Sequence, residues 1–176
     1  MHSSELAARA ARIELLLLDV DGVLTDGHVI LNNQGIESKQ FHIRDGLGIR
    51  LWQRAGFRFG VLTARTSHIV KLRTGELGID IVRQGFEDKL PVAQEIARTC
   101  GLTPEQVCYI GDDLTDLPVI RFAGLGAAVA DAVAEVQAAA ALTTKLPGGR
   151  GAVRELIETI LKAKGRWEDA IQRYLT

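Results

Sequence analysis

Four consecutive leucines, Leu15 to Leu18, run directly into the acidic segment Asp19-Val20-Asp21-Gly22. The apolar run has the length of a strand that is buried on both faces. Alternate residues of a strand point the same way, so we expect Asp19 and Asp21 to leave the sheet together. They would do so at the edge where open α/β sheets bind ligands. Two neighbouring acids repel each other unless a cation neutralises them or one holds a proton. A simple turn rich in Asp and Gly is the alternative for this segment taken alone.

Strand-length apolar runs alternate with helical patterns along all 176 residues. The alternation predicts a three-layer, Rossmann-like α/β fold, in which a mostly parallel sheet carries helices on both faces. We expect one domain over residues 1–176, in which a helix and tail form the C-terminal part from about residue 150 to 176. The expected strands are Leu15–Leu18, Phe59–Leu62, Ile79–Val82, Val107–Ile110 and Gly126–Val129, and the expected helices are Asp45–Ala55, Ser67–Leu77, Lys89–Cys100, Asp116–Ala123 and Gly151–Lys164.

One segment of about residues 27–42 interrupts this alternation. His28–Leu31 and Glu37–Phe41 have the pattern of two extended arms, joined by the turn Asn32-Asn33-Gln34-Gly35. The insertion is too small for a separate cap domain, and an isolated hairpin is barely stable in water. It must therefore pack on its own sheet or on another subunit.

Three further polar clusters follow apolar runs. Thr63 ends Val61-Leu62-Thr63-Ala64-Arg65, where a threonine also commonly caps the next helix. Lys89 opens a helix and opposes its dipole, which is unfavourable unless the ammonium meets an anion, although a solvated lysine is the ordinary case. In Gly111-Asp112-Asp113-Leu114-Thr115-Asp116, three acids follow a buried strand, more than helix capping needs. Such a cluster at the edge that holds Asp19 predicts a hard-cation site, for which Mg²⁺ fits best.

The order strand-DxD, strand-Thr, Lys, strand-GDDxxD resembles the haloacid dehalogenase superfamily. The resemblance implies a phosphatase in which Asp19 is the nucleophile and Asp21 the general acid and base, because dehalogenases lack this second acid. It further implies that Thr63 and Lys89 hold the phosphoryl oxygens. Mg²⁺ would be ligated by Asp19, Asp21 through its main-chain carbonyl, and Asp112, with Asp113 and Asp116 in support.

The hairpin and the segment from Phe41 to Gly46 narrow the resemblance to a capless subfamily of sugar-acid phosphatases. Its members act on compounds such as 3-deoxy-D-manno-octulosonate 8-phosphate, and their hairpins assemble a homotetramer. The glycine-rich stretch Pro147 to Gly151 is also similar to that subfamily, where this region can reach an adjacent active site; a loop that opens the last helix is the simpler alternative. The family usually has Gly where this chain has Ala64. The implied substrate contacts are His42, Arg44, Asp45, Gly46, Arg50, Arg65, Arg73 and Lys89, with exposed helix positions as the alternative for Arg50 and Arg73.

Composition excludes several other functions. A net charge of −1 and 5% aromatic residues argue against nucleic acid as a partner. No apolar run approaches the roughly 20 residues of a membrane span, and residues 1–12 lack a signal-peptide core. Cys100 and Cys108 lie in apolar contexts and are expected to be reduced, as in a cytoplasmic protein. Phosphatases of nonulosonate 9-phosphates or of other small phosphate esters, and a non-catalytic tetramerisation module, stay as alternatives.

Overall fold

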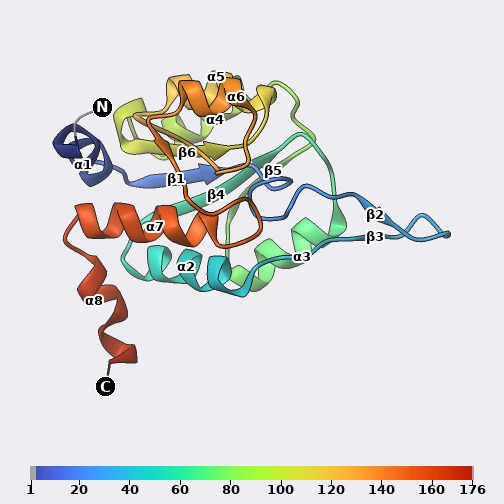
Figure 1. The fold of residues 1–176 in the computed structure, drawn as a ribbon, viewed down its shortest axis with the longest axis horizontal. Coiled ribbons are helices and arrows are strands. Elements are labelled where there is room, and N and C mark those ends of the chain that lie inside the picture. The colour runs from blue at the N-terminus through green and yellow to red at the C-terminus, as the bar shows by residue number, and fades with distance from the viewer. Residues whose placement is uncertain (1–2, 176) are drawn as a thin grey trace.

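The computed structural model describes residues 3–175. Its central feature is a six-stranded sheet, and a separate two-stranded hairpin lies outside it (Figure 1). The sheet is formed by β1 (Leu15–Leu18), β4 (Arg58–Thr63), β5 (Ile81–Gln84), β6 (Val107–Gly111), β7 (Leu125–Ala128) and β8 (Leu142–Thr143).

All neighbouring strands of this sheet are parallel, in the order β5-β4-β1-β6-β7-β8. β1 lies in the interior of the sheet between β4 and β6, and its four leucines are each 0% exposed. A strand covered on both faces is continuously apolar, which is why the leucine run folds here. The carboxyl ends of β1, β4 and β6 therefore meet at one edge.

Helices cover both faces of the sheet, as Figure 1 shows. One layer holds α4 (Lys89–Thr99), α5 (Leu117–Phe122) and α6 (Ala134–Ala139), and the other holds α2 (Ile43–Arg54), α3 (His68–Leu77) and α7 (Ala152–Ala163). α1 (Ser3–Ala11) and α8 (Trp167–Ile171) both pack against α7. Short 3-10 turns occur at Pro104–Gln106, Leu114–Asp116 and Gln172–Tyr174. The predicted fold class is confirmed.

The element boundaries differ from the expected ones where local caps intervene. β5 begins at Ile81 rather than Ile79, because Gly78 ends α3 with φ 66° and Ile79 donates its N–H to Thr74 O at 2.9 Å. Left-handed glycine is the common way to end a helix, and it delays the strand by two residues. The short elements α6, β8 and α8 were not predicted, since alanine-rich and two-residue segments carry little periodicity.

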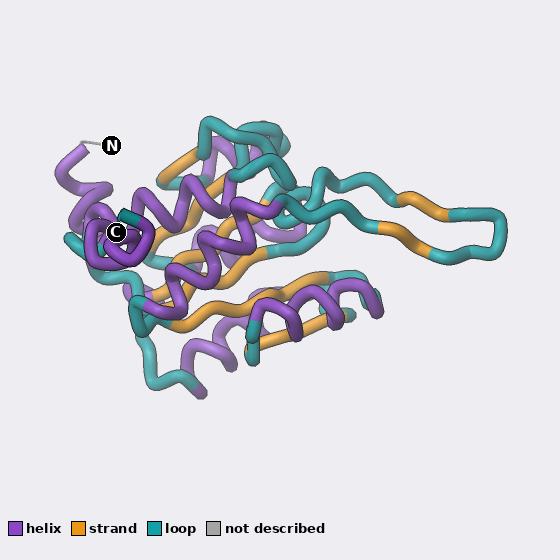
Figure 2. The backbone as a smooth tube through the Cα atoms, turned by 90° about the horizontal axis from the view of Figure 1, so that it is seen from below, coloured by secondary structure: helices purple, strands orange, loops and turns teal. Residues whose placement is uncertain are grey.

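The hairpin consists of β2 (Ile30–Leu31) and β3 (Glu37–Ser38), which pair antiparallel around the predicted turn. Its arms are shorter than expected. Figure 2 shows that it projects away from the body of the molecule rather than folding onto its own sheet. Its apolar side chains are exposed, including Leu31 at 60% and Ile36 at 61%.

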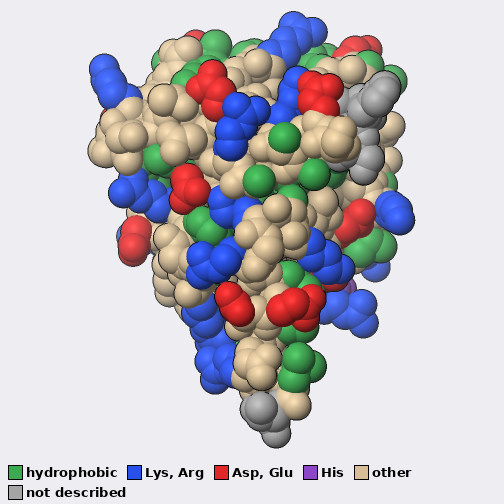
Figure 3. Space-filling model, turned by 90° about the vertical axis from the view of Figure 1, so that its left-hand side faces the viewer, with side chains coloured by type: hydrophobic (Ala, Val, Ile, Leu, Met, Phe, Trp, Pro, Cys, Tyr) green, Lys and Arg blue, Asp and Glu red, His purple; other side chains and the backbone are tan. Residues whose placement is uncertain are grey.

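The surface seen in Figure 3 mixes charges of both signs. On this face, which carries α1 and α8, basic and acidic side chains are interspersed without a large region of one sign. Among the helices of residues 3–175, none has both the length and the apolar character needed to cross a bilayer.

Candidate active site

Asp19 lies at the carboxyl end of β1 and continues the sheet by donating its main-chain N–H to Ile110 O. One carboxylate oxygen accepts the N–H of Val20 at 2.6 Å, and the other lies 2.8 Å from Lys89 Nζ. Burial raises the pKa of Asp19 to about 6, although the Lys89 ammonium partly offsets this effect. The carboxylate is thus oriented by two donors.

Lys89 comes from the first turn of α4 and is 1% exposed. Its ammonium bridges Asp19 and Asp116, the latter at 2.7 Å. Burial opposes the charge, but the two carboxylates outweigh it and raise the pKa of Lys89 above its ordinary value. The carboxylates of Asp19 and Asp116 therefore compensate the unfavourable position of this lysine at the positive end of the helix dipole.

Asp116 is fully buried, and each of its two carboxylate oxygens accepts two hydrogen bonds. Its Oδ1 accepts from Lys89 and from Tyr109 Oη at 2.6 Å, and its Oδ2 accepts the N–H groups of Asp112 and Asp113 at 2.9 and 3.2 Å. Asp116 consequently holds the loop after β6 in place. Sequence reasoning missed Tyr109, whose position on the strand that leads into the acidic loop was the available signal.

Unlike Asp116, Asp112 has a carboxylate oxygen without a hydrogen-bond donor among the described residues. Its Oδ1 is buried and accepts no hydrogen bond among the described residues. Burial, followed by the charges of Asp116 and Asp19, raises the pKa of Asp112 to about 8. A Cβ on Gly22, which has φ +91°, would lie 2.0 Å from Asp112 Oδ2, so only glycine allows this approach.

The acidic groups fit a hard divalent cation. One oxygen each from Asp19, Asp112 and Asp116 lie within 4.8 Å of one another. Each oxygen of Asp116 already accepts two hydrogen bonds, whereas each oxygen of Asp19 has one partner and Asp112 Oδ1 has none, so Asp19 and Asp112 are the pair with capacity to ligate. An unpartnered, desolvated carboxyl oxygen is the donor that Mg²⁺ takes.

Thr63 is the last residue of β4, the strand that pairs with β1, and Arg65 follows two residues later. Thr63 is 2% exposed, and its hydroxyl accepts the N–H of Arg65 at 3.3 Å. The Arg65 guanidinium lies 3.8 Å from Asp21 Oδ2. Asp113 is exposed and caps the turn at Leu114, and it is not one of the three carboxyl groups whose oxygens lie together.

Two residues at the base of the hairpin also reach the site and were missed from sequence. Lys39 forms an ion pair with Asp21, and Glu37 pairs with Arg65 at 2.7 Å. Glu37, Lys39 and Phe41 share one face of the arm by strand alternation, which was the usable signal.

Other predicted substrate residues lie on α2 and α3 with partners of their own. Asp45 is 1% exposed and accepts the N–H groups of Gly151 and Arg154, at 3.2 and 2.8 Å, so it caps the start of α7.

Arg50 donates to Glu76 O, and Arg73 pairs with Glu76. Gly46 gives Arg73 room, since a Cβ there would lie 2.5 Å from its guanidinium. His42 precedes α2 as its N-cap.

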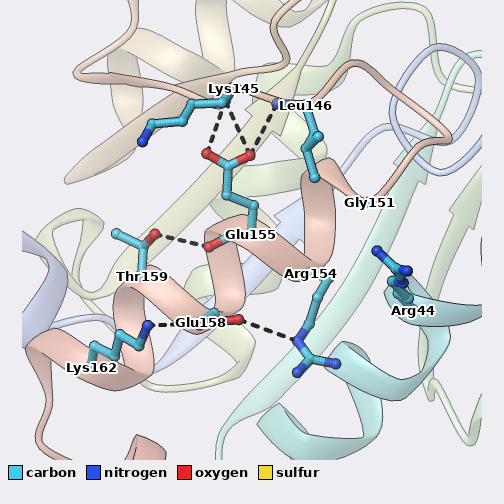
Figure 4. Close-up of a pocket in the computed structure, with 9 residues that line it drawn as sticks. All are labelled: Arg44, Lys145, Leu146, Gly151, Arg154, Glu155, Glu158, Thr159 and Lys162. Atoms are coloured by element: carbon cyan, nitrogen blue, oxygen red, sulfur yellow. Dashed lines mark hydrogen bonds and ion pairs between the residues drawn. The ribbon is translucent and has the colours of Figure 1, made fainter.

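Arg44 faces a separate feature, an open cavity of about 740 Å³ (Figure 4). Arg44 comes from α2, and Arg154 and Glu155 come from α7. Glu155 accepts the N–H groups of Lys145 and Leu146. The residues that line this cavity do not include Asp19, Asp112 or Asp116, so the cavity is distinct from the acidic cluster.

The glycine-rich segment from Pro147 to Gly151 packs within the same chain. Gly149 donates to Val23 O at 2.9 Å, and a Cβ on Gly148 would lie 1.7 Å from Gly22 O. The segment therefore buttresses the loop that follows β1 and then opens α7.

The comparisons with known proteins agree with this geometry. The model of the haloacid dehalogenase-like hydrolase family matches residues 62–156. The 3-deoxy-D-manno-octulosonate 8-phosphate phosphatase of Yersinia pestis is 44% identical over 168 residues, covering 96% of this chain and 90% of its own. That of Escherichia coli K12 is 41% identical, covering 96% and 89%.

Solved structures match over nearly the whole chain. The same phosphatase from Moraxella catarrhalis, in complex with a magnesium ion, a phosphate ion and a KDO molecule, has a TM-score of 0.96 and 38% identity, covering 98% of this chain and 99% of its own. A cobalt-bound form from Haemophilus influenzae has a TM-score of 0.90 and 38% identity, covering 96% and 99%. With the Asp19–Lys89–Asp112 arrangement, these matches show that the chain belongs to the haloacid dehalogenase-like hydrolases and, within them, to the family of the 3-deoxy-D-manno-octulosonate 8-phosphate phosphatases.

Proposed function

We propose that this chain is a magnesium-dependent phosphatase that hydrolyses 3-deoxy-D-manno-octulosonate 8-phosphate to 3-deoxy-D-manno-octulosonate and phosphate, in lipopolysaccharide sugar biosynthesis. The observation that carries the proposal is the convergence of Asp19, Lys89 and Asp112 at one sheet edge. The relatives that share this fold over nearly their whole length carry that activity in their names.

Asp19 and Asp112, together with the main-chain carbonyl of Asp21, would hold the Mg²⁺. The unpartnered Asp112 Oδ1 and the raised pKa of its carboxyl support this set. When bound, the ion neutralises charge on the phosphoryl group and the carboxylates, which lowers the repulsion between nucleophile and substrate.

Asp19 acts as the nucleophile in our proposal. Its carboxylate oxygen forms a bond to phosphorus as the bond from phosphorus to the sugar oxygen breaks, and Asp21 gives that oxygen a proton. The products are the free sugar acid, an aspartyl phosphate and an Asp21 carboxylate. Asp21 then takes a proton from water, which attacks phosphorus and releases Asp19 and phosphate. Lys89 and Thr63 stabilise the transferring oxygens.

Basic side chains would recognise the rest of the substrate. An acidic sugar phosphate carries a carboxylate beside its phosphate, and the planar forks of arginines suit both groups. Arg65 is one candidate, since its guanidinium lies 3.8 Å from Asp21 Oδ2. His42, Arg44, Gly46, Arg50 and Arg73 stay predicted contacts, whereas we assign Asp45 a structural role, because both its oxygens already cap α7.

We further propose a cytoplasmic homotetramer that assembles through the hairpins. The support is the exposed apolar tip of the hairpin, which includes Leu31 and Ile36 and projects away from the six-stranded sheet. Cys100 and Cys108 are both free thiols, which fits a reducing compartment.

The direct test measures phosphate release from 3-deoxy-D-manno-octulosonate 8-phosphate with Mg²⁺, before and after chelation, with a nonulosonate 9-phosphate as competitor substrate. We expect turnover that stops on chelation and that Asp19→Asn abolishes. Asp113→Asn is the matched control and retains turnover. An active Asp19→Asn enzyme would contradict the assignment of the nucleophile.

A further inference from the structure

The base of the hairpin places a buried ammonium against the catalytic loop. The Lys39 side chain is 1% exposed, although it lies one residue beyond β3, and residues 28–36 of the same hairpin are exposed. Its Nζ pairs with Asp21 Oδ1 and lies 3.3 Å from Glu37 Oε1. A desolvated lysine is costly unless anions compensate it, so this placement indicates a specific role.

Glu37 ties the same arm to the loop after β4. Its Oε2 accepts from Ser67 Oγ at 2.7 Å, and its Oε1 accepts from Arg65 at 2.7 Å. Ser67 in turn donates its N–H to Gln84 at the end of β5. The hairpin base is therefore linked to three successive strand ends of the sheet.

The two carboxylate oxygens of Asp21 differ in their partners. Oδ1 meets Lys39 and accepts from Thr25 Oγ1 at 3.4 Å. Oδ2 is buried, accepts no hydrogen bond among the described residues, and lies 3.8 Å from the Arg65 guanidinium. One oxygen is thus anchored and the other is left to exchange a proton.

From this geometry we infer that Lys39 is a positioning residue that orients Asp21 for proton transfer, and that Glu37 holds Lys39 in place. The inference rests on the proposed function, in which Asp21 protonates the leaving oxygen. It assigns the hairpin a part in the chemistry of its own subunit, in addition to any contact made by its tip.

The leaving group separates this role from simple structural support. An alkyl oxygen, as in a sugar phosphate, needs a proton as it leaves, whereas 4-nitrophenolate departs without one. The ratio kcat/KM reports the steps up to that departure. Poor positioning of Asp21 should therefore reduce kcat/KM for the sugar phosphate far more than for 4-nitrophenyl phosphate.

The experiment compares Lys39→Met with the wild type on both substrates. General acid–base help is worth about 10²–10⁴-fold, so we expect a loss of roughly tenfold or more on the sugar phosphate and of less than about threefold on 4-nitrophenyl phosphate. Lys39→Arg, which keeps the charge, should restore most of the lost rate. Glu37→Gln should show the same asymmetry more weakly.

Two further variants make the result decisive. Lys71→Met, at an exposed position of α3, is the matched control and should behave as the wild type. Asp21→Asn should show the leaving-group asymmetry at full size; if it does not, the proposed acid role fails instead. Equal losses on both substrates in Lys39→Met, or no loss at all, would overturn the inference while leaving Asp19 chemistry intact. A folded Lys39→Arg variant without rescue would overturn it as well.

Discussion

Asp116 illustrates how burial separates carboxylates that look equivalent in the sequence. Asp112, Asp113 and Asp116 follow the same strand, yet only Asp116 is fully buried and accepts from Lys89, Tyr109 and two main-chain N–H groups. Its charge balances Lys89, which in turn orients Asp19. The stability of the acidic loop therefore depends on this one carboxylate.

Replacing Asp116 with Asn should destabilise the fold by about 3 kcal/mol, because it leaves a buried ammonium with one anion fewer. The measurement is the free energy of unfolding in urea. Asp113→Asn, at the exposed position, is the matched control and should cost no more than about 1 kcal/mol as a weakened cap. Equal losses in the two variants would contradict the assigned role.

Magnesium affinity should rise with pH. Asp112 has a pKa of about 8 before metal binds, so below that pH it carries a proton that Mg²⁺ must displace. The dissociation constant should therefore fall by up to about tenfold per pH unit between pH 6.5 and 8 and level off above, as proton linkage requires. Calorimetric titration at several pH values checks this. A dissociation constant that is independent of pH would contradict it.

The glycine-rich segment shows how one loop supports another. A Cβ on Gly148 or Gly149 would lie within 3 Å of main-chain atoms of the loop that follows β1. Gly148 also donates its N–H to Asp131. This close backbone approach explains the glycines without any contact to a second subunit, and it links α7 to the position of Gly22 beside Asp112.

Gly148→Ala should lower the free energy of unfolding by about 1–3 kcal/mol, since the added methyl group meets a main-chain oxygen that cannot move alone. Magnesium affinity should fall with it, because Gly22 adjoins Asp112. Gly75→Ala in α3 is the control: nothing lies within 4 Å of its Cβ, and alanine should stabilise the helix by about 0.5–1 kcal/mol. Equal stability of Gly148→Ala and the wild type would show that the contact is not tight.

Assembly should depend on the tip of the projecting hairpin. Leu31 and Leu72 are each 60% exposed, but Leu31 belongs to the apolar tip and Leu72 to α3. Light scattering after size exclusion should give a tetramer for the wild type and for Leu72→Glu, and smaller species for Leu31→Glu. A monomeric wild type, or an unchanged Leu31→Glu tetramer, would contradict the proposed assembly.

Short-range patterns were enough to predict the layers of the fold and most of its elements. β1 was expected at its observed bounds, because four successive leucines have the length and the continuous apolar character of a strand covered on both sides. Parallel strands share a carboxyl edge, so the positions of Asp19, Thr63 and Asp112 at strand ends already predicted their proximity. The place of Lys89 in a first helical turn was only a hint, since a solvated lysine was the ordinary expectation there, and its role came from the family resemblance.

Burial and long-range packing decided the rest. Which carboxyl keeps an unpartnered oxygen depends on Tyr109 and on main-chain donors that meet Asp116 only after folding. The motif around Asp45 predicts a substrate contact, but both its carboxylate oxygens accept main-chain N–H groups at the start of α7. Lys39 lies at the base of the hairpin and forms an ion pair with Asp21, while the tip of the hairpin projects from the body of the molecule. Hydrophobic periodicity carries no information about such pairings, since they depend on distance in space and on the loss of water around each charge.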